Sequence, residues 1–395
     1  MVPRPLRRPA ATCDAPILYL AWGRLGDHLL GRAIPAVLRA RQPGGLVMVA
    51  RPEVEGAVVD VVDRFVPLDP ARLTDHRGRE ALLAALDEPF AAVVADLHLF
   101  HGGWSWCNEL IDSVSAPVKL VYEGYAPREL LAPHRRWPRS AELVRALPAS
   151  GGAAPDDPRE RHVWYHQRHY LAAVLRALGL PDELDDADLH PNLPAPPSTG
   201  LAARLGLAEG AYLACQPVSA NRKKDLPLEV WRDVFAQFPG QQFVVLGGMR
   251  DAARARALAA PNVRLLAGAT DLPQCFELIA GARLFVGIDS GLTHAAACLG
   301  RPVVCVSQAS NLGWFFPYPP ELGADLDVVW DRRFAACAGC GAACEHQPLW
   351  RSYRAGVRCL QELGAPPVAS AIRRRLAFPD LCPAAPLPES ASCTA

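Results

Sequence analysis

The sequence predicts an α/β protein with two domains, each built on a largely parallel sheet. Short apolar runs alternate with segments of helical spacing along most of the chain, which is the pattern of parallel strands covered by helices. The 395 residues can bury two cores, and the usual domain size favours two domains over one. The stretch 182–200 is acidic and then proline-rich, which suits a connection between domains. We therefore place the domains at 1–195 and 196–375, with the hinge at 190–200.

The first domain begins with a βαβ unit. Residues 17–22 and 46–50 form apolar runs of strand length, and residues 29–41 between them have helical spacing. Further apolar runs follow in VVDRFVPL, FAAVVADLHLF and PVKLVY, separated by segments that allow helices. This alternation predicts a parallel sheet with helices on both faces.

The second domain resumes the same alternation with a clearer signal. Strands are predicted in AYLACQPV, QQFVVLGG, VRLLAG, RLFVGI and PVVCVS. Helices are predicted in LPLEVWRDVFAQF, LPQCFELIAGA and THAAACLG. The final residues 376–395 are rich in proline and serine, so we expect a disordered tail.

The composition excludes several classes of protein. Basic and acidic residues number 41 each, so no overall field attracts nucleic acid or an anionic membrane. The basic, proline-rich first segment lacks the apolar core of a secretory signal, and no apolar run reaches the roughly 20 residues that cross a bilayer. We therefore expect a cytoplasmic protein. Six scattered cysteines are expected to be buried free thiols: Cys13, Cys107, Cys215, Cys275, Cys298 and Cys305.

The segment VGIDSGLTHAAACLG predicts an anion site at a strand-to-helix turn. The first amides of a helix lack intrahelical partners and carry the positive end of its dipole, so they form a seat for a phosphate or carboxylate. Gly287 and Gly291 allow close backbone approach, and hydroxyl and imidazole donors come from Ser290, Thr293 and His294. A carboxylate would repel an anion, so we expect Asp289 to cap helix amides or to accept bonds from sugar hydroxyls. The alternative is a capped helix start with a structural histidine.

Two other segments add candidate residues. The loop CQPVSANRKKDLP follows a predicted strand and gathers groups that neutralise a pyrophosphate, namely Ser219, Asn221, Arg222, Lys223 and Lys224. Its alternative is a solvated basic loop. In WGRLGDHLL, Asp27 stands at the entrance to a helix. Asp27 is either an N-cap or, in a cleft between domains, a general base.

Together these segments resemble the heptosyltransferases of glycosyltransferase family 9. The resemblance rests on LGDHLLGRAIPAVLRARQP, VDRFVPLD, VVADLH, RKKDLPLEVWRDVFAQF, VVLGG and, above all, DSGLTHAAACLGRPVVCV. It implies a GT-B fold, in which two Rossmann-like domains face each other across a cleft. It further implies that the first domain binds the acceptor and that the second binds a nucleotide sugar, normally ADP-heptose. The implied reaction moves heptose, with inversion, to a hydroxyl of a lipopolysaccharide core or a related glycan.

The resemblance also assigns roles to individual residues. Asp27 matches the family's catalytic base, and Lys224 matches its phosphate-binding lysine because it stands three residues before Pro227. Leu226 replaces the usual tryptophan of that motif, and Arg222 or Lys223 is able to share the role of the lysine. The remaining donor-binding residues implied around the diphosphate and sugar are Ser219, Asp289, Ser290, Gly291, Thr293 and His294. Such chemistry needs no cofactor when cationic side chains and helix amides stabilise the leaving diphosphate.

A cysteine cluster near the end of the chain predicts a structural metal site. Cys337, Cys340, Cys344 and Cys359 are soft ligands at a spacing that suits tetrahedral zinc or iron. The last gap is long, so His346 is an alternative to Cys359 as the fourth ligand. Reduced thiols without metal are the alternative for the whole cluster. Four protein ligands leave no open position for catalysis.

Acceptor recognition is assigned to loops of the first domain. Aromatic faces stack on sugars, so His98, Trp104 and Glu123 are candidate acceptor-binding residues, with packing roles as the alternative. A glycolipid acceptor implies peripheral contact with the cytoplasmic face of the inner membrane.

Three alternative functions remain: a family 9 enzyme with another nucleotide sugar, one with a small-molecule or protein acceptor, and a non-catalytic nucleotide-sugar-binding module. A dinucleotide-dependent oxidoreductase is disfavoured, because GRLGDHLLG lacks the G-x-G-x-x-G order.

Overall fold

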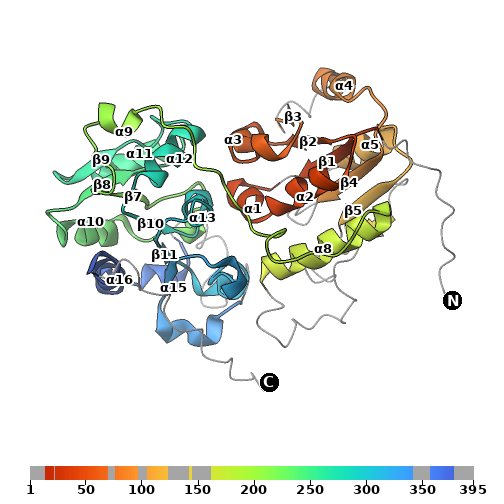
Figure 1. The fold of residues 1–395 in the computed structure, drawn as a ribbon. Coiled ribbons are helices and arrows are strands. Elements are labelled where there is room, and N and C mark those ends of the chain that lie inside the picture. The colour runs from red at the N-terminus through yellow and green to blue at the C-terminus, as the bar shows by residue number, and fades with distance from the viewer. Residues whose placement is uncertain are drawn as a thin grey trace. The chain divides into compact units, whose positions relative to one another are not determined.

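The computed structural model describes residues 14–21, 23–69, 76–96, 105–122, 142–144, 162–340 and 356–377. The chain separates into two compact units, Met1–Leu193 and Pro194–Ala395 (Figure 1). Each unit contains a six-stranded sheet in which every strand pair is parallel. The α/β class with two parallel sheets that the sequence predicts is therefore confirmed.

The sheet of the first unit has the strand order β3-β2-β1-β4-β5-β6. Its strands are β1 (Ile17–Ala21), β2 (Leu46–Ala50), β3 (Arg64–Pro67), β4 (Ala92–Asp96), β5 (Lys119–Tyr122) and β6 (Glu142–Val144). Its α-helices are α1 (Leu25–Leu30), α2 (Ala33–Arg41), α3 (Glu55–Val58), α4 (His76–Ala85), α5 (Ser105–Ser113) and α8 (Val163–Leu178). The central strands β1 and β4 are buried along their whole length, which explains their uninterrupted apolar sequence.

The single helix predicted over 29–41 is two helices. Helix α1 begins at Leu25, earlier than expected, and ends at Gly31, after which α2 starts at Ala33. Pro35 explains the break, because it has no amide to donate to the carbonyl of Gly31 and its ring would clash with that carbonyl inside a continuous helix. The break lies at Gly31 and Arg32, between the two helices.

The sheet of the second unit has the strand order β12-β11-β10-β7-β8-β9. Its strands are β7 (Tyr212–Gln216), β8 (Gln242–Val245), β9 (Val263–Leu265), β10 (Leu284–Ile288), β11 (Val303–Val306) and β12 (Leu326–Val329). Its α-helices are α9 (Leu201–Arg204), α10 (Leu228–Ala236), α11 (Ala252–Ala255), α12 (Leu272–Ala280), α13 (Gly291–Cys298), α15 (Arg358–Gln361) and α16 (Ala365–Ala377). Helix α10 packs against α16, and α12 packs against α13. All five strands predicted for this unit are present.

The end of α16 corrects one expectation. Residues 376 and 377 complete this helix rather than begin the predicted tail, because Ile372 and neighbouring apolar side chains pack into the core of the second unit. The rest of the tail, 378–395, lies outside the described residues. Within the part of the chain that is described, no helix is both long and apolar enough to cross a membrane.

Each sheet contains one point where the strand order reverses. The chain runs outward from β1 to β3 and returns to the other side of β1 with β4, and it does the same from β7 to β9 and then β10. Ligands of doubly wound sheets bind beyond the carboxyl ends of the two strands at such a point. In the first unit these ends carry Ala21 and Asp96, which are register partners. In the second unit they carry Gln216 and Gly287.

Candidate functional site

The predicted anion seat lies at the reversal point of the second unit. Strand β10 ends at Ile288, Asp289 and Ser290 form the turn, and α13 begins at Gly291. Gly287 is required here by packing, because a Cβ would lie 2.8 Å from the Phe285 ring and 2.9 Å from Thr293 Oγ1. Gly287 therefore serves the contact between strand and helix, and the predicted ligand approach stays a prediction.

The side chain of Gln216, the last residue of β7, caps the start of α13. Its Oε1 accepts hydrogen bonds from Ser290 Oγ and from the amide of Leu292, the latter at 3.3 Å. Thr293 Oγ1 donates to the carbonyl of Ile288. The hydroxyls of Ser290 and Thr293 thus bond protein groups in this structure, and both side chains are buried; their predicted ligand contacts stay a prediction.

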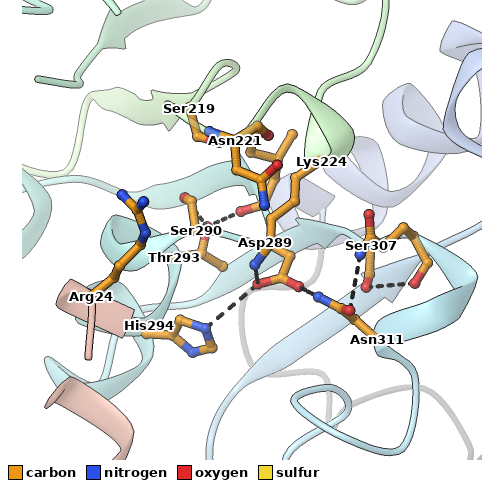
Figure 2. Close-up of polar contacts among 12 residues, drawn as sticks. Arg24, Ser219, Asn221, Lys224, Asp289, Ser290, Thr293, His294, Ser307 and Asn311 are labelled. Atoms are coloured by element: carbon orange, nitrogen blue, oxygen red, sulfur yellow. Dashed lines mark hydrogen bonds and ion pairs between the residues drawn. The ribbon is translucent and has the colours of Figure 1, made fainter. Parts of the chain in front are cut away.

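Asp289 is the centre of the site. Its side chain is 2% exposed and receives Lys224 Nζ at 3.0 Å on Oδ1 and Asn311 Nδ2 on Oδ2 (Figure 2). His294 Nε2 lies 3.7 Å from Oδ1. These partners replace the helix amides that the sequence analysis expected Asp289 to cap. The reason is positional: Ser290 is the N-cap residue, so Asp289 stands one residue too early to reach the amides of the first turn.

The charge of Asp289 follows from these contacts. Burial alone would raise the pKa of the carboxyl group, but Lys224 and His294, followed by Asn311, outweigh burial and hold the pKa well below its usual range. Asp289 is therefore an ionised group that fixes a lysine, a histidine and an amide in place.

His294 is held on both of its ring nitrogens. Nδ1 forms a hydrogen bond with the Tyr318 hydroxyl, Nε2 faces Asp289, and the ring stacks on Phe316 with centroids 4.9 Å apart. Burial raises the pKa of Tyr318, so its hydroxyl remains protonated beside Nδ1. His294 therefore contacts Asp289 and Tyr318 in this structure, and its predicted donation to a phosphate oxygen stays a prediction.

A fixed loop after β7 brings Lys224 to Asp289. Asn221 Oδ1 accepts from the Lys223 amide at 3.2 Å and starts the short 3-10 helix Arg222–Lys224. Ser219 Oγ and Asn221 exchange hydrogen bonds of 3.2 Å on the same side of the loop (Figure 2). Arg222 is exposed and Lys223 is buried, while the contact with Asp289 is made by Lys224.

The side chains of Asp225 and Arg254 hold this loop in place. Asp225 accepts hydrogen bonds from the Ser219 amide at 3.0 Å and from Arg254. Arg254 also donates to the Ser219 carbonyl at 3.0 Å. Leu226, where the family motif has tryptophan, is 2% exposed and belongs to the core. The position of Lys224 is thus set by buried contacts on the next residues of the chain.

A second polar segment that the sequence analysis missed follows β11. The 3-10 helix Ala309–Asn311 carries Asn311, whose Oδ1 accepts from Gln308 Nε2 at 2.9 Å. Gln308 and Asn311 stand beyond the carboxyl end of a strand adjacent to β10. The run SQASN after the apolar PVVCV was an available signal, because polar residues at this edge of a parallel sheet face the ligand crevice.

The reversal point of the first unit holds a small pocket. Its lining includes Tyr19, Asp27, His28 and Asp96. Asp27 is the third residue of α1, not its N-cap, and its Oδ2 accepts from the Arg24 amide at 2.8 Å. The Tyr19 hydroxyl donates to Asp96 Oδ2 at 3.3 Å, and burial, together with Asp96, raises the pKa of Tyr19. The other candidate acceptor residues, His98, Trp104 and Glu123, lie outside the described residues.

The cysteines divide into two groups. Cys215, Cys275, Cys298 and Cys305 are buried and form no disulfide with another described residue, as predicted, whereas Cys13 and the side chain of Cys107 lie outside the described part. Cys337 and Cys359 both pack on the small cluster of Ala309, Leu312, Trp330 and Phe334. Cys359 Sγ accepts from the Ala309 amide at 3.4 Å, and the Cys340 amide donates to the Cys337 carbonyl at 3.1 Å.

The metal site itself stays a prediction. Among the described residues no group of three or more histidine, cysteine, aspartate or glutamate side chains is placed to hold a metal ion. Two of the candidate ligands, Cys344 and His346, lie in the segment 341–355, outside the described residues. The packing of Cys337 and Cys359 on one cluster is compatible with the predicted ligand set.

Comparisons with solved structures identify the fold. The structure of the ADP-heptose lipopolysaccharide heptosyltransferase II of E. coli matches 93% of this chain and 100% of its own, at a TM-score of 0.62 and 18% identity. The E. coli heptosyltransferase WaaC, solved with ADP-2-deoxy-2-fluoro heptose, matches 92% of this chain and 99% of its own, at a TM-score of 0.55 and 19% identity. Because these likenesses cover nearly whole chains, they confirm the predicted GT-B fold class.

Comparisons of sequence find a similarity to one family over part of the chain. Lipopolysaccharide heptosyltransferase 2 of Escherichia coli K12 is 43% identical over 79 residues, which make up 18% of this chain and only 23% of the relative. The family model described as glycosyltransferase family 9 (heptosyltransferase) matches residues 156–325, which contain Lys224, Asp289 and α13. The predicted resemblance to glycosyltransferase family 9 is therefore confirmed over residues 156–325, the part of the chain that the family model matches.

Proposed function

We propose that the protein is an inverting glycosyltransferase that moves heptose from ADP-heptose to a hydroxyl of a lipopolysaccharide core or a related glycan. The observation that carries this proposal is the arrangement at the reversal point of the second unit, where Lys224 stands beside the start of α13. A fixed ammonium group and the amino end of a helix together favour a diphosphate. Family 9 membership, and the ADP-heptose analogue named with E. coli WaaC, support the choice of donor.

The second unit binds the donor and stabilises its leaving group in this proposal. Negative charge develops on the diphosphate as its bond to the anomeric carbon breaks, and the diphosphate keeps the electron pair. Lys224, which Asp289 holds in position, and the Gly291 amide at the amino end of α13 stabilise this charge. Asp289 acts on the ligand through Lys224 and His294, so it is a positioning residue.

The first unit binds the acceptor and supplies the base. An acceptor hydroxyl enters the pocket lined by Tyr19, Asp27 and Asp96 and gives its proton to the Asp27 carboxylate. The hydroxyl oxygen attacks the anomeric carbon on the face opposite the diphosphate, which inverts the configuration. The bond from the Arg24 amide orients the Asp27 carboxylate for this step.

Two further assignments complete the proposal. Cys337, Cys340, Cys344 and Cys359 hold a structural zinc or iron ion, supported by the packing of Cys337 and Cys359 on one cluster. The protein works in the cytoplasm and meets a glycolipid acceptor at the cytoplasmic face of the inner membrane.

The proposal is tested first by Asp27→Asn. The asparagine keeps an oxygen for the Arg24 amide but is not a base, so we expect unchanged ADP-heptose affinity and a rate of transfer lower by about 10²–10⁴-fold. Asp87→Asn, an exposed aspartate of the same unit, is the matched control and should keep its rate. A wild-type protein that binds the donor but transfers nothing would instead be a non-catalytic binding module.

A screen of ADP-, GDP-, UDP- and dTDP-sugars tests the donor. A ligand that binds only the folded protein at about 100 times its Kd adds about 2.7 kcal/mol of stability, which is measurable as a rise in melting temperature. We expect the largest rise with ADP-sugars. A larger rise with another nucleotide would overturn the heptose assignment while leaving the family assignment intact.

A further inference from the structure

Two side-chain amides extend the contacts of Asp289 toward the end of β11. Asn311 Nδ2 donates to Asp289 Oδ2, and Gln308 Nε2 donates to Asn311 Oδ1 at 2.9 Å. Gln308 stands two residues after the end of β11, and the Asp289 amide donates to the carbonyl of Val306, the last residue of that strand, at 3.1 Å. The chain of polar groups thus follows the edge of the sheet at which the anion seat lies.

The negative charge of Asp289 fixes which group donates and which accepts in each of these hydrogen bonds. An ionised carboxylate only accepts hydrogen bonds, so Asn311 must turn its NH₂ group toward Asp289. Its carbonyl oxygen then faces Gln308, which must in turn present its own NH₂ group. Reversing either amide would place two donors or two acceptors against each other. Lys224 on Asp289 maintains the ionised form from which this order follows.

This orientation of the two amides leaves the side-chain carbonyl oxygen of Gln308 at the end of the series of hydrogen bonds that starts at Asp289. Gln308 is 7% exposed, and Oε1 is buried with no hydrogen-bond partner within the described ranges of the chain. A buried acceptor without a partner costs free energy, and native proteins rarely retain one without a reason. A ligand that brings a hydroxyl or amino proton to this oxygen removes the cost.

We propose that Gln308 determines donor specificity by accepting a hydrogen bond at Oε1 from a sugar hydroxyl of the bound nucleotide sugar. The inference rests on the proposed function, in which the second unit binds that donor. The hydroxyl belongs either to the ribose or to the transferred sugar, which share the chemistry that an amide oxygen recognises. An ionised diphosphate has no proton to give, so Gln308 recognises the sugar part of the ligand and Lys224 recognises its charge.

The test is Gln308→Leu, measured by calorimetric titration with inorganic pyrophosphate, ADP and ADP-heptose. Pyrophosphate has no sugar hydroxyl, so its affinity should stay unchanged. The affinity for ADP-heptose should fall by about three- to tenfold, the range expected for one neutral hydrogen bond. An equal fall for ADP identifies the ribose, and an unchanged ADP affinity identifies the transferred sugar. Gln237→Leu at the exposed end of α10 is the matched control and should bind all three ligands normally.

Three results would overturn the inference in distinguishable ways. Unchanged affinity for both ADP-heptose and ADP removes Gln308 from ligand recognition and leaves the proposed function standing. An equal loss for all three ligands, including pyrophosphate, shows that Gln308 only supports Asn311 and Asp289. A wild-type protein that binds pyrophosphate but neither ADP nor ADP-heptose overturns the proposed donor, and this inference with it. Should Gln308→Leu unfold, Gln308→Met removes the same amide with a more flexible side chain.

Discussion

Replacing Asp289 with asparagine removes the negative charge at the centre of the site and changes its shape very little. The asparagine side chain of that variant accepts through only one oxygen. Its NH₂ group must therefore face either the ammonium of Lys224 or the NH₂ of Asn311. Lys224, whose side chain is 25% exposed, loses its counter-charge in a largely buried place. The structure thus predicts a large loss of stability from a nearly isosteric change.

The magnitude follows from the burial of Asp289. Removing one partner of a buried ion pair typically destabilises a protein by about 3–5 kcal/mol. Because asparagine retains one accepting oxygen, we expect the lower end, about 3 kcal/mol. For a unit of about 200 residues this corresponds to a fall in melting temperature of about 6–12 °C.

The stabilisation that Asp289 provides should depend on pH and should be lost at low pH. The pKa of Asp289 is depressed in the folded protein, so its contribution to stability is full above the unfolded-state pKa, about 3.9. The contribution is lost as pH falls toward the folded-state pKa. The difference in unfolding free energy between the wild type and Asp289→Asn should therefore be constant above about pH 5 and shrink below it.

Urea unfolding at several pH values between about 3 and 8 measures both quantities. Asp233→Asn, an exposed aspartate on α10, is the control and should change stability by less than about 0.5 kcal/mol. The reasoning is refuted if Asp289→Asn behaves like this control. It is also refuted if the difference from the wild type stays constant down to the lowest pH.

The remaining predictions concern the start of α13 and the cysteine cluster. Gln216→Leu leaves Ser290 Oγ and the Leu292 amide without their acceptor, so thermal or urea unfolding should show a loss of about 1–3 kcal/mol; no loss would remove Gln216 as a helix cap. Elemental analysis of protein purified without chelator should find about one zinc or iron per chain, and Cys337→Ser should lower this content. Metal-free wild-type protein would leave reduced thiols as the correct interpretation.

The sequence was sufficient to predict the parts of the fold and site that depend on local pattern. Alternating apolar runs indicated the strands of both sheets, and the turn after β10 was evident from a strand, small residues and a helical segment. The choice of Lys224 over its neighbours depended on its spacing from Pro227, and Lys224 is the residue that contacts Asp289.

The contacts that the sequence did not predict depend on which strands are neighbours in the sheet. Gln216 lies 74 positions from Ser290, and Asn311 lies 22 positions from Asp289, so neither contact leaves a local pattern. Both become predictable only once β7 and β11 are known to flank β10. The bonds that Ser290, Thr293 and His294 make to protein groups were not predicted for the same reason.

Elements near the end of the chain were missed for a related reason. Strand β12 is short and contains a buried aspartate, Asp327, which gives no apolar run. Arg375 of α16 is buried against it at 3.0 Å, so each charge is compensated by a residue far away in the sequence. From the sequence alone, a buried charged residue such as Asp327 looks like any exposed polar residue, so the strand that contains it is not recognised.

The central claim is that Lys224 and the start of α13 hold the diphosphate of a nucleotide sugar. A crystal structure of the protein with ADP-heptose tests it most directly. We predict diphosphate oxygens within hydrogen-bonding distance of Lys224 Nζ and of the Gly291 amide at the start of α13. A well-defined ligand bound elsewhere, with Lys224 still paired only to Asp289, would contradict the claim.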